Sequence, residues 1–223
     1  TLVQTTNNTH ILLSNFFVLL ALRRIMSLSS QKNVKSKLFD AALWVAVASV
    51  FYFWAILFFA AVILSLILYT DNNIRHWILP FLGIGTVLII AMSISILFYG
   101  DYFEISKESQ SISYDFSPYN SVKFLVAITM LLSFGIWSSI FYLQNIKKKK
   151  KASRVSFKMV IIVAIIASVL VLQAPKKNGS EFLFLFAPLA IIATNYIETI
   201  EEKWFKEAFL AALVLLPFVL LML

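Results

Sequence analysis

A single acidic residue, Asp40, interrupts a long apolar stretch of the chain. Ionisable side chains inside apolar segments are expensive to keep in lipid, and they often mark a substrate or proton pathway. Asp40 also lies about one turn into a predicted helix, where the helix dipole favours a carboxylate, and Lys37 or Arg24 could neutralise its charge. These features favour a structural role, and a functional intramembrane acid is the alternative.

Two neighbouring arginines, Arg23 and Arg24, are candidates for binding a phosphate. A guanidinium group binds phosphate oxygens in a bidentate manner, so the pair could contact a lipid headgroup or a lipid-linked phosphate. Arginines that directly follow an apolar segment also anchor that segment at the membrane surface. The anchor is the favoured interpretation, and the headgroup contact is the alternative.

The longest polar segment, residues 100–120, contains two acids close to an apolar segment, Asp101 and Glu104. An acid in this outer loop could act in catalysis, although a solvated loop is the favoured interpretation. The chain has no Cys and only two His, His10 and His76, so we expect no metal site. The sequence shows no glycine-rich phosphate loop and no catalytic triad. We therefore expect no cofactor, and the catalytic residues of any enzyme activity stay unknown.

The composition places these residues in a membrane protein. Of the 223 residues, 61% are hydrophobic, and the mean hydropathy is +0.88, whereas soluble domains are nearer to 45–50% apolar. A net charge of +8 could indicate a nucleic-acid partner, but the cations lie between apolar segments, where they determine membrane topology. We therefore expect membrane lipids as partners, other membrane subunits as a second class of partner, and no nucleic acid.

The apolar segments predict an all-α, polytopic transmembrane bundle in a single domain. A helix needs roughly 20 apolar residues to cross the hydrocarbon core, which gives about seven spans if the first is counted as partial. Polar residues within the segments are expected to form hydrogen bonds between helices; they are Ser14, Asn15, Ser49, Thr194 and Asn195. The predicted segments, eight if each is counted, are 11–25, 38–51, 53–70, 77–99, 121–145, 159–173, 182–197 and 208–223.

The apolar run 38–70 is too long for one upright helix and short for two complete ones. The aromatic sequence Phe51-Tyr52-Phe53-Trp54 stands at its midpoint. We expect two short helices, 38–51 and 53–70, which meet in a tight turn near one membrane face. A single long, tilted helix is the alternative.

The basic residues indicate how the chain is oriented. Lys and Arg concentrate in cytoplasmic loops. Suppose that the lysine run lies inside the cell; it consists of Lys147, Lys148, Lys149, Lys150 and Lys151. If 38–70 contains two helices, most of the other Lys and Arg residues then lie inside the cell as well. Loop 146–158 is then cytoplasmic and loop 100–120 periplasmic, in a multi-pass protein of the bacterial inner membrane. The lysine run serves here as a topology anchor, although it could also bind anionic lipid or a partner.

Residues 20–84 resemble a known family. The features that carry the resemblance are the sequences ALRRI at 21–25, KLFDA at 37–41, ASVFYFW at 48–54 and RHWILPF at 75–81. They are similar to those of polytopic inner-membrane proteins of Bacteroidota that form a domain of unknown function. That family is typically longer at its N-terminus, and Thr1 begins a polar stretch without the features of a signal peptide. We therefore expect further spans upstream; the resemblance implies a compartment and a fold, but no activity.

A more distant likeness is to polyprenol-phosphate-dependent glycosyltransferases of the GT-C type. Those enzymes often have a basic loop followed by a long apolar run that is broken at its middle, as in residues 23–70. The sequence Ala187-Pro188-Leu189 is similar to part of one of their later spans. Their catalytic acid normally lies in the first outer loop, which would precede this chain, so no catalytic residue is carried over.

Three classes of function are compatible with these features, and whether the protein is an enzyme is left open. The first is the handling of a lipid-linked sugar at the outer face, in the manner of GT-C-type enzymes. The second is a non-catalytic membrane subunit of an envelope complex for secretion, motility or respiration, which the scarcity of intramembrane acids favours. The third is a transporter or flippase, which would need a water-filled cavity lined by Asp40, Arg23 or Arg24.

The orientation can be tested on intact spheroplasts, because the chain contains no native Cys. We expect Ser113→Cys, in the 100–120 loop, to react with a membrane-impermeant maleimide. We expect Ser153→Cys, in the 146–158 loop, to react only after lysis. Labelling of Ser153→Cys in intact spheroplasts would invert the topology.

Overall fold

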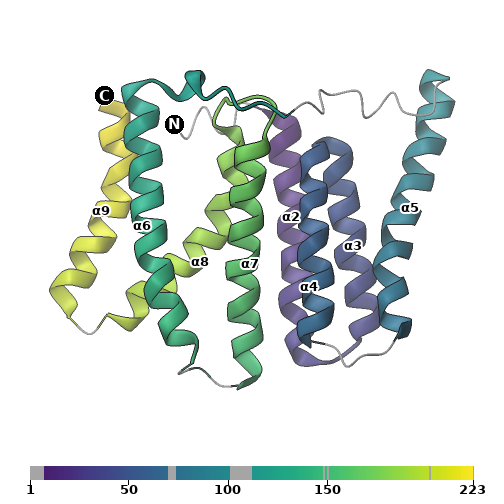
Figure 1. Cartoon of the computed structure of the whole chain (residues 1–223), viewed down its shortest axis with the longest axis horizontal. Coiled ribbons are helices and arrows are strands. Elements are labelled where there is room, and N and C mark those ends of the chain that lie inside the picture. Colours follow the sequence, from purple (N-terminus) through teal and green to yellow (C-terminus); the bar gives the residue numbers. More distant parts are fainter. Residues whose placement is uncertain are drawn as a thin grey trace.

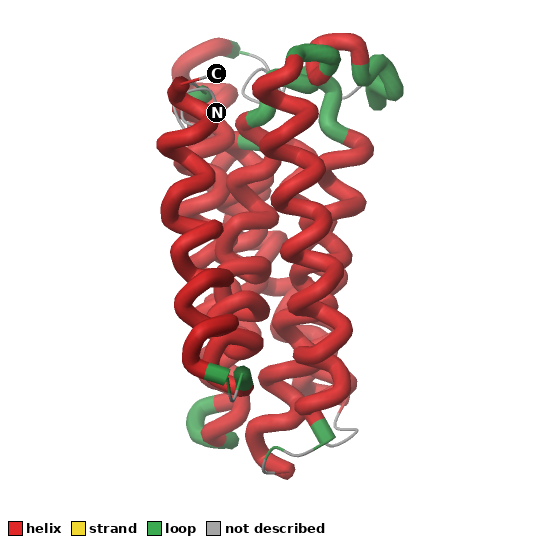
Figure 2. Tube along the Cα trace, turned by 90° about the vertical axis from the view of Figure 1, so that its left-hand side faces the viewer, coloured by secondary structure: helices red, strands yellow, loops and turns green. Residues whose placement is uncertain are grey.

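The chain folds into helices, most of which run side by side along one direction (Figure 1; Figure 2). The computed structural model describes residues 8–69, 74–100, 112–147, 149, 151–200 and 202–222. Regular structure within these residues is helical throughout, which confirms the predicted all-α class. The α-helices are α2 (Thr9–Ser27), α3 (Val34–Phe51), α4 (Phe59–Tyr69), α5 (Ile74–Tyr99), α6 (Val122–Ile146), α7 (Lys151–Gln173), α8 (Leu183–Thr199) and α9 (Lys203–Met222). The short 3-10 helices are η1 (Leu28–Ser30), η2 (Phe53–Phe58), η4 (Ser117–Tyr119) and η5 (Ser180–Phe182).

Five helical stretches in the described part of the chain are long and apolar enough to cross a membrane. The outward faces of these helices are apolar, and other parts of the protein cover only a small share of two of the helices. Only 17% of the 18-residue apolar stretch in His76–Phe98 is buried within the protein, and only 6% of the corresponding stretch in Val122–Ile146 is buried. Apolar surface exposed to water costs roughly 25 cal/mol per Å², so these helices indicate a membrane protein. The five stretches are Thr9–Ser30, His76–Phe98, Val122–Ile146, Ser153–Gln173 and Ser180–Thr199.

The chain leaves helical geometry at Tyr52, which has φ −144° and ψ 106°. The helix α3 ends just before it, and η2 then leads into α4, which runs in the opposite direction (Figure 1). Packing supports the turn, because the Tyr52 ring stacks on Phe184 of α8 with ring centroids 5.7 Å apart. The prediction that 38–70 contains two helices is therefore confirmed, and the single long helix is wrong.

Successive α-helices alternate in direction, so the connections gather at two ends of the bundle (Figure 1; Figure 2). We call one end the lysine-rich end, because it contains the α2–α3, α6–α7 and α8–α9 connections and the cations Lys32, Lys147 and Lys149. The opposite end contains Tyr52, the residues 112–121 before α6, and the loop between α7 and η5. The predicted orientation would place the lysine-rich end in the cytoplasm.

The helices α2 and α3 form the tightest pair in the core. Fully buried alanines of α3, including Ala41 and Ala48, let the two backbones approach closely. The Ser14 hydroxyl of α2 donates to Ala48 O at 2.9 Å, which confirms the predicted hydrogen bond between helices. The Ser49 hydroxyl instead donates to Ala46 O within its own helix at 2.7 Å.

The helix α5 reaches α3 through Gly83. A Cβ atom at Gly83 would lie 2.8 Å from Phe39 O and 3.0 Å from the Cβ of Ala42, so a side chain there would force the two helices apart. Gly85, on the same helix, has nothing within 4 Å of the corresponding position. The two glycines therefore differ in packing although both belong to α5.

Replacement of Gly83 by alanine should weaken the contact between α3 and α5, because the backbones must separate to admit the methyl group. We expect a loss of roughly 1–3 kcal/mol, measured as a lower unfolding temperature in detergent micelles. Gly85→Ala is the matched control, and it should be neutral or slightly stabilising because alanine favours helix. Equal unfolding temperatures for the two variants would contradict the close contact.

Candidate functional site

The intramembrane acid predicted from the sequence is neutralised by an arginine. Arg24 Nε lies 3.2 Å from Asp40 Oδ2, and the two side chains are 48% and 28% exposed. Lys37, the other predicted partner, instead donates from Nζ to Ser27 O and to Ser30 Oγ, each at 2.7 Å. The ion pair joins the end of α2 to the beginning of α3, and an exposed pair of this kind contributes at most about 1 kcal/mol.

The other sequence candidates lie near helix ends or outside the described residues. Arg23 is exposed near the end of α2. Lys147 is exposed after α6, and Lys149 Nζ lies 5.2 Å from the centroid of the Phe157 ring. Lys151 is the first residue of α7. The candidates outside the described residues are Asp101, Glu104, Lys148 and Lys150.

A buried acid at the opposite end was not among the sequence candidates. Glu181, in η5, is 0% exposed, and the Tyr119 hydroxyl of η4 donates a hydrogen bond to its Oε1 atom. Backbone N–H groups of Asn178, Gly179 and Glu181 itself also lie near the carboxyl group. Its Oε2 atom has no hydrogen-bond partner among the described residues. The two side chains are 62 positions apart in the sequence, so no local pattern could have paired them.

A buried cation in the same loop closes the end of α7. Lys177, which is 5% exposed, donates from Nζ to Val171 O at 2.8 Å and to Leu172 O at 2.7 Å. These carbonyl groups belong to the last turn of the helix, where acceptors lack intrahelical donors and the helix dipole is negative. The ammonium also lies 4.9 Å from the centroid of the Phe116 ring. Burial lowers the pKa of Lys177 because it removes water from the charged ammonium. The two carbonyl groups and the Phe116 ring replace that water and stabilise the charge.

Two turns hold these buried polar groups in place. Gly179 has φ +91°, which residues with a side chain rarely adopt, and a Cβ atom there would lie 2.7 Å from Phe124 Cε1. In the other loop, Asp115 Oδ1 accepts a hydrogen bond from the Ser117 N–H at 3.0 Å. Hydrogen bonds from Ser117 hold the pKa of Asp115 below its usual range, and this turn leads into η4. The Phe116 ring contacts both the Tyr119 ring and the Lys177 ammonium, so the two buried groups share one aromatic neighbour.

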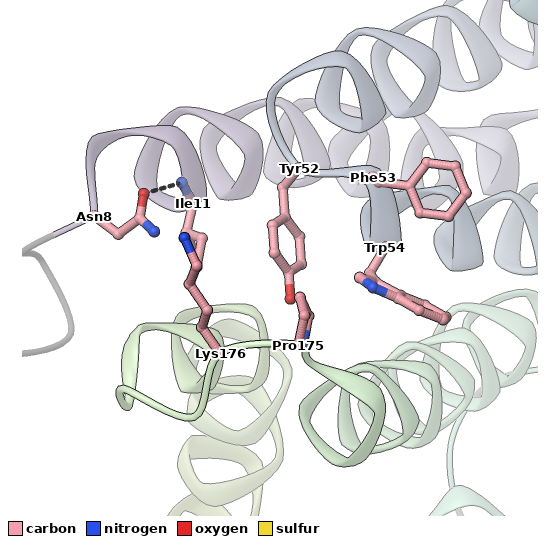
Figure 3. A pocket seen from close by; sticks show the side chains of 7 residues that line it. All are labelled: Asn8, Ile11, Tyr52, Phe53, Trp54, Pro175 and Lys176. Atoms are coloured by element: carbon pink, nitrogen blue, oxygen red, sulfur yellow. Dashed lines mark hydrogen bonds between the residues drawn. The ribbon is translucent and has the colours of Figure 1, made fainter. Parts of the chain in front are cut away.

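A small pocket at the same end lies between the beginning of α2, the break after α3 and the loop after α7 (Figure 3). It encloses about 30 Å³, which is room for about one water molecule. The Asn8 Oδ1 atom is already used, because it caps α2 by accepting from the N–H groups of His10 at 3.1 Å and Ile11 at 3.4 Å. We call this the opposite-end pocket, and its lining residues are Asn8, Ile11, Tyr52, Phe53, Trp54, Pro175 and Lys176.

The opposite-end pocket brings together hydrogen-bond donors and aromatic rings from three segments. Lys176 is exposed and extends from its loop toward Asn8 and Ile11 (Figure 3). Trp54 contributes a buried indole N–H that has no partner among the described residues. An ammonium, an amide and an indole N–H can all donate to an anionic oxygen or to a sugar hydroxyl. None of the seven lining residues is acidic.

These features define an α-helical membrane protein with a donor-lined pocket at one end. Residues 1–222 match the family described as a family of unknown function (DUF6427), and the chain belongs to that family. The comparisons with curated proteins and with solved structures gave no significant match. The resemblance to a family of unknown function is therefore confirmed, while the Bacteroidota origin and the GT-C likeness stay predictions.

The pairing of Tyr119 with Glu181 predicts a non-additive pair of substitutions. Tyr119→Phe removes the donor and leaves a buried carboxyl group, so we expect a loss of roughly 1–3 kcal/mol. Glu181→Met alone leaves the hydroxyl without its acceptor, whereas the double variant removes both polar groups and should cost less than the sum. Unfolding temperatures in detergent micelles measure all three.

Tyr114→Phe is the control for this cycle, because Tyr114 is 72% exposed before η4. We expect it to have no effect on the unfolding temperature. If the effects of Tyr119→Phe and Glu181→Met simply add, the two groups do not interact in the folded protein.

Proposed function

We propose that the protein is a multi-pass inner-membrane protein of bacteria that handles a lipid-linked sugar at the outer face. The opposite-end pocket is the observation that carries this proposal. It combines an exposed ammonium, an amide and a buried indole N–H within one small space beside aromatic rings. Phosphates and sugars are the membrane-surface ligands that need such a mixture of charge, donors and flat apolar faces.

The parts of the pocket have different roles in this proposal. The Lys176 ammonium binds a phosphate oxygen as a mobile point charge. The indole N–H of Trp54 donates to a phosphate oxygen or to a sugar hydroxyl, and the ring of Phe53, which is 38% exposed, offers an apolar face to the sugar. The enclosed space suits one small polar group, so the remainder of the headgroup lies across the rim.

The orientation supports an outer location for the opposite-end pocket. The connections at the lysine-rich end hold the described cations Lys32, Lys147 and Lys149, and loops rich in Lys and Arg stay in the cytoplasm. The loop between α7 and η5, which holds Lys176 and Lys177, lies at the opposite end. With all eight predicted segments crossing the membrane, the short pair α3 and α4 included, the pocket faces the periplasm. The break at Tyr52 also agrees with the likeness to GT-C-type transferases, in which a long apolar run is interrupted at its middle.

The two alternative functions make different demands on the molecule. A membrane subunit needs helix faces for other subunits, and α6 offers one because so little of it is buried. A transporter or flippase needs a hydrated pathway past Asp40, and this carboxylate is already paired with Arg24. The ion pair favours a structural role for Asp40, so the pocket, rather than this acid, carries the proposal.

Binding of lipid-linked ligands to the protein in lipid nanodiscs tests the proposal. The probes are a polyprenyl phosphate and a polyprenyl phosphate that carries a hexose, with phosphatidylglycerol as the comparison lipid. We expect tighter binding of the polyprenyl ligands. Lys176→Gln should weaken the binding of both about tenfold, equivalent to about 1.4 kcal/mol, and Trp54→Phe should weaken the binding of the glycosylated ligand most.

Lys123→Gln is the matched control, because Lys123 is an exposed cation at the same end, in the first turn of α6. It should leave the affinities unchanged. Equal affinity for phosphatidylglycerol and the polyprenyl ligands, or no effect of Lys176→Gln, would overturn the proposal. Stoichiometric co-purification of other membrane proteins together with this lack of selectivity would favour the subunit alternative.

A further inference from the structure

A second and much larger cavity lies between α6, α7 and α8. It is an apolar groove of about 320 Å³, which is within the range of about 300–1,000 Å³ that is usual for ligand sites. The helices α6 and α7 form its two walls, and α8 passes between them at an angle (Figure 1). The residues that line this apolar groove are Leu131, Leu132, Gly135, Ile136, Ser139, Ile140, Leu143, Ile161, Ala164, Ile165, Ser168, Leu185 and Leu189.

The lining face of α7 continues toward the lysine-rich end as a line of cations. Ile161, Ile165 and Ser168 line the groove, and residues three or four positions apart lie on one helix face. The same spacing, extended back along the helix, reaches Lys158 and then Arg154, both of which are exposed. This face is therefore apolar along the groove and cationic beyond its end.

The helix α6 shows the same change from apolar to cationic. Its groove residues Ile136, Ser139 and Leu143 are three and four positions apart, and the next position on this face is Lys147, which is exposed. Both walls of the groove thus end in cations at the same end of the bundle. None of these cations has a carboxylate within ion-pair distance among the described residues.

Arg154 joins the beginning of α7 to two described residues that follow α6. The Arg154 guanidinium donates from Nε to Lys149 O at 2.9 Å and from one Nη to Lys147 O at 2.7 Å. These bonds tie the beginning of α7 to the end of α6. Lys158 lies about 10 Å along α7 from its first residue, so its flexible stem can run along the groove while its ammonium reaches the headgroup region.

The length of the groove distinguishes a lipid chain from a helix of another protein. From Leu131 to Leu143 the α6 wall spans about 18 Å. One leaflet provides about half of a hydrocarbon core that is about 30 Å thick, so the groove matches one leaflet. A transmembrane helix of a partner spans the full thickness and would extend well beyond the groove.

We propose that the apolar groove binds one acyl chain of an anionic phospholipid, whose phosphate lies against Lys147 and Lys158 at the lysine-rich end. The cations at the end of both walls are complementary to the anionic headgroup, and the apolar walls are complementary to the acyl chain. By the orientation proposed above, this lipid belongs to the cytoplasmic leaflet. The site lies at the other end of the protein from the opposite-end pocket, so either proposal can fail without the other.

Native mass spectrometry of the purified protein with added phosphatidylglycerol or phosphatidylethanolamine tests the charged part of this site. We expect phosphatidylglycerol to be retained preferentially. The double variant Lys147→Gln and Lys158→Gln should reduce its retention about tenfold, with Arg154 left intact because it ties the loop. The matched control, Lys203→Gln and Lys206→Gln, removes two cations of α9 near the same end and should have little effect.

A second pair of variants tests the groove itself. Ser168→Phe should fill part of the groove and reduce retention of phosphatidylglycerol, whereas Val169→Phe, at the next position and outside the groove, should not. Equal retention of the two lipids, or equal effects of the two cation pairs, would overturn the proposal. Retention that survives Ser168→Phe in a protein with an unchanged unfolding temperature would overturn it too, as would a protein subunit found in the groove.

Discussion

The absence of water inside a hydrocarbon layer is the constraint on which the rest of this structure depends. Every backbone N–H and C=O group in that layer needs a partner within the chain, and α-helices provide one. Helices therefore fill the described residues between the two ends of the bundle. The break at Tyr52 lies at the opposite end, and even there its N–H donates to Ala48 O at 3.0 Å.

The same constraint decides where polar side chains are found and how each is compensated. Asp40 lies near the lysine-rich end and pairs with Arg24. At the other end, Lys177 is buried on the carbonyl groups that end α7, and the carboxyl group of Glu181 is covered and bonded by Tyr119. Because a buried charged group without partners is costly, these three charged groups lie near helix ends, where neighbouring segments supply partners. Both proposed ligand sites follow this rule, with their polar parts at an end and their apolar parts along the helices.

Local features of the sequence were sufficient to predict the helices, but not the sites. The apolar length of 38–70 and its aromatic midpoint predicted the break that Tyr52 makes. The charges around the first loop predicted that Lys37 or Arg24 neutralises Asp40, and the structure shows Arg24. The contact of Glu181 with Tyr119 joins two loops 62 positions apart, so it depends on tertiary packing alone. The pocket and the groove each combine three segments, and only one of their cationic residues, Lys147, had been singled out from the sequence.

Accessibility of a spin label on α6 tests most directly whether hydrocarbon surrounds the bundle, because this helix is scarcely covered by protein. The chain has no Cys, so Ser133→Cys, exposed in the middle of α6, and Tyr114→Cys, exposed before η4, can each carry a single label. In lipid nanodiscs, the label at 133 should collide more often with oxygen, which dissolves in lipid, than with a water-soluble nickel chelate, and the label at 114 should show the reverse. A label at 133 that prefers the nickel chelate would contradict the account.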